Sequence, residues 1–475
     1  MRTPSPVNSE WWRPDVALHQ GDRGGARTTA QPQDSGGAIP YWAMMAFTFI
    51  LFIAPQTLVP SLVPFRIALL TAVFAITTYV FDKLASGKPL MMRTREVGIA
   101  AGLIAWSIVT VPFSLRPGES LSVLLETYGK TLAVFWLLSH TVTTLARLRQ
   151  VAWAVTLMTV PMAVTAIRHY MSGTFIPGTN RILGYDAPMT GDPNGLALVL
   201  NMILPLSVAL LLFSRKPVIR MSLLVIIFLD VVAVILTLSR GGFVTLALIF
   251  GVYVWKLLRR SQTGWVPAGL ALTLACLLVL PSGYLDRLAT ISDMKSDATG
   301  SAQDRWRDMV AAVNVALHNP IVGVGLGMNG LALTEERGPT WSYKNGELML
   351  VHNVYLVYAA ELGLPGLVLF LMFLAGCMRE SMAAQVRSSG VPALQELSYL
   401  AEGIQVSLIA FAVGALFDPN AYQFHCYYVA GLAVAVGAVS QSAAMKEAEP
   451  SPPMSQTPSS TESLPEYSAR AFARV

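Results

Sequence analysis

The chain has 475 residues, of which 54% are hydrophobic and only 13% are charged. Soluble globular proteins carry about twice that share of charged residues, so the composition argues against a soluble domain and indicates a membrane protein. The formal net charge of +5 does not point to nucleic acid as a partner. In a membrane protein, lysine and arginine first mark the cytoplasmic loops.

Apolar runs of roughly 20 residues recur along the chain, and each is long enough to cross a hydrocarbon core of about 30 Å. They predict an all-α, polytopic protein embedded in a lipid bilayer. About twelve transmembrane helices are expected, at residues 40–58, 61–82, 97–114, 121–140, 149–168, 193–213, 219–238, 241–258, 265–282, 352–377, 396–417 and 421–441.

These spans form a transmembrane domain over residues 40–441, between two tails that we expect to be disordered. Residues 1–39 are rich in Pro, Gly, Ser, Gln and Arg, and residues 442–475 are rich in Ser, Pro and Glu, as is typical of chains that form no core. Lysine and arginine gather in every second loop, which predicts that both tails are cytoplasmic. The long loop at residues 283–350 then faces out of the cytoplasm, and we expect it to contain short helices.

Arg240 breaks this charge pattern, because it lies in the turn Leu238-Ser239-Arg240-Gly241-Gly242 on the outer side. One interpretation is an arginine that reaches lipid phosphate. The other is an anion-binding arginine, since the glycines allow close backbone approach and the amides of the following helix N-terminus also favour anions.

The long outer loop contains two more arginines, Arg305 and Arg307, in a segment predicted to be an amphipathic helix. Its apolar residues recur at helical spacing, which predicts a helix lying on the protein or on the membrane surface; they are Trp306, Met309 or Val310, Val313 and Leu317. Each arginine is either an exposed charge paired with a neighbouring aspartate or a guanidinium directed at a diphosphate, whose oxygens accept two parallel hydrogen bonds.

His352 stands where the next apolar run begins. It shares a predicted helical face with Tyr355, and Asn353 is adjacent. An interfacial packing role competes with a catalytic one, in which the imidazole takes a proton from a hydroxyl. Glu361 is half a turn out of phase with His352 and is expected to support a partner. Pro365 predicts a kink, with the span proper starting near Gly363 and the preceding segment lying along the interface.

Other polar motifs have simpler interpretations. The stretch from Gly323 to Gly330 lacks the lysine and hydroxyl of a P-loop, so we expect a turn that returns the loop to the membrane. Asp192 before Pro193 predicts a helix N-cap. The three cysteines lack metal-ligand spacing and are expected to be packing residues, with no metal site; they are Cys276, Cys377 and Cys426.

The order and spacing of these motifs resemble the O-antigen ligase and O-antigen polymerase family over residues 185–440. The resemblance is carried by Ser239-Arg240-Gly241-Gly242, by Asn319-Pro320 before Gly323, Gly325 and Gly327, and by His352-Asn353-x-Tyr355-Leu356 with Glu361, Gly363 and Gly366.

This resemblance implies a membrane-embedded glycosyltransferase of the bacterial inner membrane. Its donor would be a glycan on undecaprenyl diphosphate, and its acceptor lipid A-core, another glycan or a protein. Neither a metal nor a nucleotide-sugar cofactor is implied. The family's outer arginines map onto Arg240 and Arg305 and its essential histidine onto His352. Arg307 competes with Arg305, because Met309 stands where the family pattern has leucine.

Two other classes of function are compatible with the composition. A transporter of polysaccharide or lipid-linked oligosaccharide would also have about twelve spans, but it should distribute charged residues through a central cavity. In this sequence the charged residues that are candidates for a functional site gather at the predicted outer face. A sensory or scaffold protein gains no support from that polar cluster.

Overall fold

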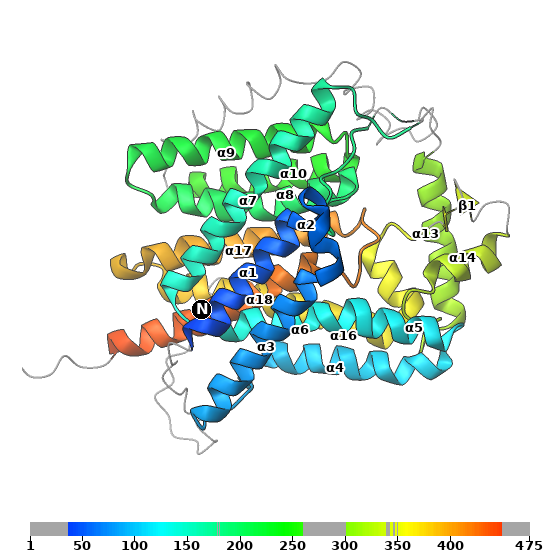
Figure 1. Cartoon of the computed structure of the whole chain (residues 1–475), viewed down its shortest axis with the longest axis horizontal. Helices are drawn as coiled ribbons and strands as arrows, with labels where there is room; N and C mark the ends of the chain where they lie inside the picture. Colours follow the sequence, from blue (N-terminus) through cyan, green and yellow to red (C-terminus); the bar gives the residue numbers. More distant parts are fainter. Residues whose placement is uncertain are drawn as a thin grey trace, which may run out of the picture. The chain divides into compact units, whose positions relative to one another are not determined.

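The computed structural model describes residues 37–177, 179, 181–259, 301–338, 343–344, 347–348 and 350–448. Within these residues the fold is almost entirely helical (Figure 1), which confirms the predicted all-α class. The exceptions are an isolated bridge and two antiparallel two-residue strands, β1 (Tyr343–Lys344) and β2 (Glu347–Leu348). Both predicted tails, apart from their residues nearest the bundle, and the predicted span at 265–282 lie outside the described residues.

Ten helices of the described part are long and apolar enough to cross a membrane, so the protein is a multi-pass membrane protein. The spanning segments are α3 (Ile67–Ala85), α4 (Arg95–Thr110) with η2 (Val111–Phe113), α5 (Pro117–Val123) with the π-helix η3 (Leu124–Tyr128) and α6 (Gly129–Thr141), α7 (Leu145–Met171), α8 (Pro193–Phe213), α9 (Pro217–Leu236), α10 (Arg240–Arg259), α16 (Val354–Ser388), η6 (Pro392–Leu394) with α17 (Gln395–Gly414), and α18 (Phe424–Ala448).

The first predicted span is shorter in the structure. It forms α1 (Ala38–Ile53), followed by the short α2 (Pro55–Leu58) and the 3-10 helix η1 (Pro60–Phe65), before α3 begins. Proline opens both short elements and cannot donate a backbone hydrogen bond, so the two predicted helices are separated by a series of short turns.

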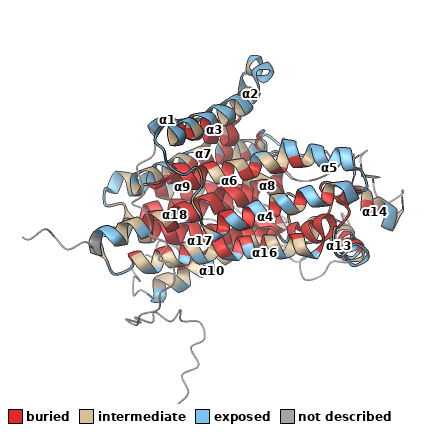
Figure 2. Ribbon diagram, turned by 90° about the horizontal axis from the view of Figure 1, so that it is seen from below, coloured by how far each residue is buried: buried red, intermediate tan, exposed pale blue. Residues whose placement is uncertain are grey.

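The core of the bundle lies along α8, α17 and α18, where Figure 2 shows most of the buried residues. In the stretch of α8 that is long and apolar enough to cross a membrane, 83% of the residues are buried, whereas in the corresponding stretch of α3 the share is 11%. A helix that is apolar on all sides belongs inside a bundle. The exposed apolar side chains of α3 are those expected of a helix that faces lipid.

Helix α16 is broken at Gly363, which has φ 69° and ψ −178°. The predicted start of a new segment near this glycine is confirmed. The turns before it pack against protein, since Val357, Tyr358 and Leu362 are at most 1% exposed. Their position along the membrane interface stays a prediction. The indole Nε1 of Trp106 donates to the carbonyl of Leu362 (2.8 Å), which satisfies a group that the break releases from the helix.

Two further helices, α13 (Ser301–His318) and α14 (Asn329–Arg337), lie between α10 and α16 in the chain. They are joined by an ion pair between the buried Asp308 and Arg337. The predicted α13 helix is confirmed. Its packed side, however, carries Asp308, Ala312 and Val315 rather than the larger apolar residues named above.

Candidate functional site

His352 is held immediately before α16 by its neighbours in the chain. The Asn353 side chain caps the helix, accepting from the amides of Tyr355 (3.0 Å) and Leu356 (3.2 Å), as short polar side chains do at N-caps. The amide of Val354 donates to the carbonyl of Ala415 at the end of α17 (2.8 Å). These bonds fix the backbone of His352 relative to two spanning helices.

The imidazole of His352 is half-buried, and its Nδ1 lies 2.9 Å from the carbonyl oxygen of Leu350. A carbonyl oxygen can only accept, so Nδ1 carries the hydrogen and Nε2 presents a lone pair. Burial, the charge of Arg305 and the charge of Arg181 lower the pKa of His352 to about 4, although Asp192 and the Leu350 carbonyl oppose them. The ring is therefore neutral near pH 7 and able to accept a proton at Nε2.

Arg240 is half-buried and is the first residue of α10. Ser239 caps this helix, its hydroxyl accepting from the amide of Gly242 (3.2 Å). A Cβ on Gly241 would lie 2.6 Å from Phe417, and one on Gly242 would lie 2.7 Å from Ala197. The two glycines let the start of α10 approach α8 and the α17–α18 connection, which also contacts the start of α16.

A third arginine, Arg181, joins this region through Asn194, near the start of α8. The Arg181 guanidinium donates to Asn194 Oδ1 (2.7 Å), which also accepts from the Ser239 hydroxyl (2.9 Å). The Nε of Arg181 also donates to the carbonyl of Thr237 (3.3 Å). No local spacing in the sequence connects Arg181 with Asn194 or Ser239, so the sequence alone does not predict these contacts.

Arg305 and Arg307 differ in their surroundings although they are two residues apart on α13. Arg305 is half-buried, and its charge acts on both His352 and Asp308. Arg307 is exposed, with 54% of its side chain accessible, and lies 4.0 Å from Asp304. The positive charge of Arg305 lowers the pKa of His352.

Two polar residues near His352 hold helix ends in place. Asp192 caps α8 as predicted, accepting from the amides of Asn194 and Gly195. Its negative charge also raises the pKa of His352. The Tyr355 hydroxyl donates to the carbonyl of Ala412 (2.7 Å), which fastens the start of α16 to α17.

Glu361 is fully buried and accepts hydrogen bonds from the glycine-rich turn. One carboxylate oxygen accepts from the amide of Gly327 (2.7 Å), and the other accepts from the amide (2.9 Å) and side chain (2.5 Å) of Asn329. Such turns with free amides commonly bind phosphate. Here the internal carboxylate takes that place, so Glu361 joins α16 to the α13–α14 region.

The turn itself is built on glycine, as the sequence predicted. Gly323, Gly325 and Gly327 all have positive φ, between 67° and 101°, a range that other residues adopt only with strain. The amides of Val324 and Gly325 donate to carbonyls of α16 (both 2.9 Å). These bonds attach the turn to α16 just before the break at Gly363.

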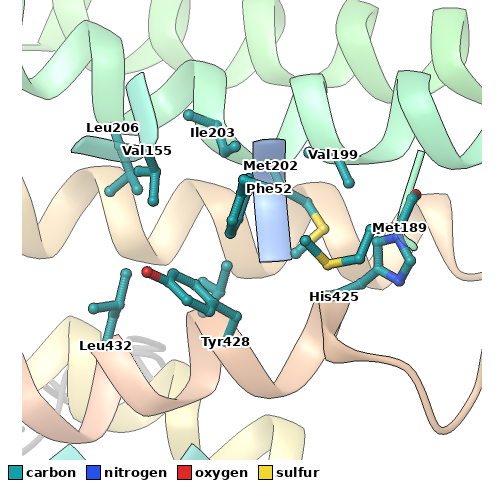
Figure 3. A pocket seen from close by; sticks show the side chains of 11 residues that line it. Phe52, Val155, Met189, Val199, Met202, Ile203, Leu206, His425, Tyr428 and Leu432 are labelled. Atoms are coloured by element: carbon teal, nitrogen blue, oxygen red, sulfur yellow. Dashed lines mark hydrogen bonds between the residues drawn. The ribbon is translucent and has the colours of Figure 1, made fainter. Parts of the chain in front are cut away.

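Asp418, between α17 and α18, and His425, near the start of α18, are both 3% exposed. Burial raises the pKa of Asp418, while the nearby His425 opposes the shift. His425 Nε2 donates to the carbonyl of Met189 (3.1 Å). Figure 3 shows His425 beside an otherwise mainly apolar pocket that reaches towards Leu432. Its volume of about 20 Å³ has room for roughly one water molecule, so it is not a glycan site.

A family model described as O-antigen ligase matches residues 223–371. The matched segment runs from α9 into α16 and includes Arg240, Arg305, His352 and Glu361. A search of curated proteins finds no match.

Proposed function

We propose, since this chain is a member of the O-antigen ligase and polymerase family, that it transfers a glycan from undecaprenyl diphosphate to an acceptor hydroxyl. The observation that carries the proposal is the neutral imidazole of His352, with Nε2 available and with the charge of Arg305 and Arg181 acting on it. An acceptor base beside cationic groups is what displacement of a diphosphate requires.

The chemistry follows from these groups. His352 Nε2 takes the proton of the acceptor hydroxyl as the acceptor oxygen forms a bond to the anomeric carbon. The bond from that carbon to the diphosphate oxygen breaks at the same time, and its electron pair leaves with the diphosphate. A single displacement of this kind inverts the anomeric configuration. The donor is already activated, so no nucleotide or metal is needed in this scheme.

We assign the developing phosphate charge to Arg240 and Arg305. Planar guanidinium groups bind phosphate oxygens through paired hydrogen bonds, and their effect is large where water is excluded. The half-burial of both residues supports the assignment, whereas the exposure of Arg307 favours a solvent role for it. Arg181 adds positive charge and holds the turn that contains Arg240 through Asn194.

The distribution of basic residues supports an extracytoplasmic site in the inner membrane. Arg147 and Arg149 are near the start of α7, Arg259 ends α10, and Arg387 is near the end of α16. Each of these positions is at the helix end away from the one that leads to the site. Cytoplasmic loops are enriched in lysine and arginine, so the opposite end, with His352, is assigned to the periplasm.

The test is a transfer assay with purified protein in lipid, an undecaprenyl-diphosphate-linked glycan and an acceptor. His352→Ala should lower kcat by about 10²–10⁴-fold, the usual contribution of a general base, while donor binding persists. The matched control is His318→Ala. His318 is exposed on α13, and its Nδ1 also bonds a backbone carbonyl, that of Asn314 (2.9 Å). Normal turnover of His352→Ala would remove this histidine as the base.

Deletion of the gene in its native host separates the acceptors. Complete loss of attached surface glycan indicates a ligase, and retention of one attached repeat unit indicates a polymerase. Lipid-linked glycan that fails to cross the membrane would instead favour the transporter.

A further inference from the structure

Helix α13 presents a continuous apolar stripe that the described residues leave uncovered. The exposed fractions are 55% for Trp306, 46% for Val310, 41% for Val313 and 70% for Leu317. Residues at this spacing share one face of a helix. The packed side of α13 carries Asp308, whose side chain pairs with Arg337, so the helix is held by one face and displays the other.

The stripe continues into the exposed side of a spanning helix. Ile321, which follows α13, is 65% exposed, and its carbonyl oxygen lies 2.1 Å from the position that a Cβ on Gly363 would take. The amide of Leu364 donates to the carbonyl of Pro320 (2.8 Å). Leu364 and Val368 are 50% and 51% exposed. They begin the uncovered apolar side of α16, a segment long and apolar enough to cross a membrane.

This continuity places the end of α13 where the spanning part of α16 starts. Figure 1 shows α13 running crosswise to α16 and α4, and Figure 2 shows it nearly end-on beside them. A helix crosswise to the spans lies in the plane of the bilayer. Arg305 and Arg307 are the neighbours of Trp306 in the sequence and lie to either side of the stripe. Tryptophan and arginine are typical of the boundary between headgroups and acyl chains.

We propose that the stripe Trp306–Val310–Val313–Leu317 lies in the bilayer surface, with its side chains between the lipid headgroups and the upper acyl chains. Amphipathic helices of this pattern bind in that plane through one apolar face. The occupant is the lipid surface itself, at the end of the bundle that carries His352. Because α13 also bears Arg305, lipid contact fixes that guanidinium relative to the histidine.

Fluorescence quenching by brominated lipid tests this contact directly. The protein is reconstituted in nanodiscs of phosphatidylcholine and phosphatidylglycerol whose acyl chains carry bromine either near the headgroup or near the methyl end. The Trp306 signal is the difference between wild-type protein and Trp306→Phe. We expect shallow bromine to quench it at least twofold more strongly than deep bromine.

The control tryptophan is placed on α14 by Glu335→Trp in the Trp306→Phe background. Glu335 is exposed on a polar helix, and its signal should be unaffected by bromine. An unquenched Trp306 would overturn the proposal, since the stripe would then face water or protein. Stronger quenching by deep bromine would also overturn it, because the helix would then enter the hydrocarbon core. The readout involves no glycan transfer, so it is independent of the proposed reaction.

Discussion

The state of one imidazole decides whether the proposed base can work. The hydrogen bond from Nδ1 to Leu350 leaves Nε2 as the acceptor, and burial with two nearby arginines lowers the pKa of His352 to about 4. Above that pH the ring is neutral and competent. Protonation at lower pH removes the lone pair, so the proposed activity should fall through about pH 4.

The same environment predicts how neighbouring charges move the acidic limb of kcat/KM. Arg305→Gln removes a positive charge that lowers the pKa of His352, so the limb should shift to higher pH. Asp192→Asn removes a negative charge that raises it, so the limb should shift to lower pH, while asparagine still caps α8. Rates measured against pH at constant ionic strength give both midpoints.

Arg307→Gln is the matched control for Arg305→Gln, because Arg307 is an exposed arginine on the same helix. The acidic limb of kcat/KM for Arg307→Gln should keep the midpoint of the wild-type protein. An equal shift in both arginine variants would mean that the general charge of α13, rather than the position of Arg305, acts on His352.

Glu361 shows what sequence reasoning could and could not find at the residue scale. Helical phase separated it from His352, and the structure agrees, because both carboxylate oxygens face the turn around Gly327. Its partners are more than 30 residues away in sequence, and a carboxylate that accepts backbone amides leaves no local pattern. The composition of the turn predicted its shape but not the group that fills it.

At the scale of elements, the junction between the glycine-rich turn and α16 depends on Gly363. Alanine there would meet two costs. The backbone conformation, φ 69° and ψ −178°, strains any residue with a Cβ by about 1–3 kcal/mol. The Cβ would also meet the Ile321 carbonyl, and such overpacking costs typically 1–3 kcal/mol.

Gly363→Ala should therefore lower the free energy of unfolding by more than Gly390→Ala. Gly390 also has positive φ, 82°, but nothing lies within 4 Å of its added Cβ. Unfolding in mixed micelles of increasing denaturing detergent gives both values. Equal losses would show that strain alone matters and that the close contact with Ile321 does not.

The prediction for α13 illustrates why element boundaries are easier to predict than element faces. Spacing of Trp306, Val310 and Val313 predicted the helix, which the structure confirms. The same spacing left open whether the apolar face meets protein or the membrane surface, and in the structure smaller residues such as Ala312 pack against the protein. Apolar periodicity does not distinguish protein from lipid as the partner, so the side that packs depends on contacts with α14 and α16.

At the scale of the whole molecule, hydropathy was sufficient for the fold class because backbone groups in lipid must be satisfied within each helix. Apart from the first predicted span, whose helix ends at Ile53, the spans observed in the described residues follow the predicted runs. Hydropathy did not predict which separate stretches of the chain come together at the candidate site. Arg181 and Arg305 act on His352 from separate stretches of the chain, and Arg181 is joined through Asn194 to the turn that contains Arg240. These relations depend on how the helices pack.

The proposed orientation predicts the side from which each end of the bundle can be labelled. Gln303→Cys, exposed on α13, should react with a membrane-impermeant maleimide in intact spheroplasts. Ser86→Cys, exposed after α3, should react only after permeabilisation. Wild-type protein provides the background, and its described cysteines, Cys377 and Cys426, are buried. The reverse pattern would place His352 on the cytoplasmic side.

The carboxylate inside the glycine-rich turn also bears on how this fold can evolve. The amides of Gly327 and Asn329 already converge on a negative group, so the geometry of a phosphate cradle exists without being open to ligands. Losing Glu361 would expose that cradle and, in the same step, remove one of the links between α16 and the segment carrying Arg305. The residue that keeps a ligand out of the turn is thus also one that joins the turn to α16.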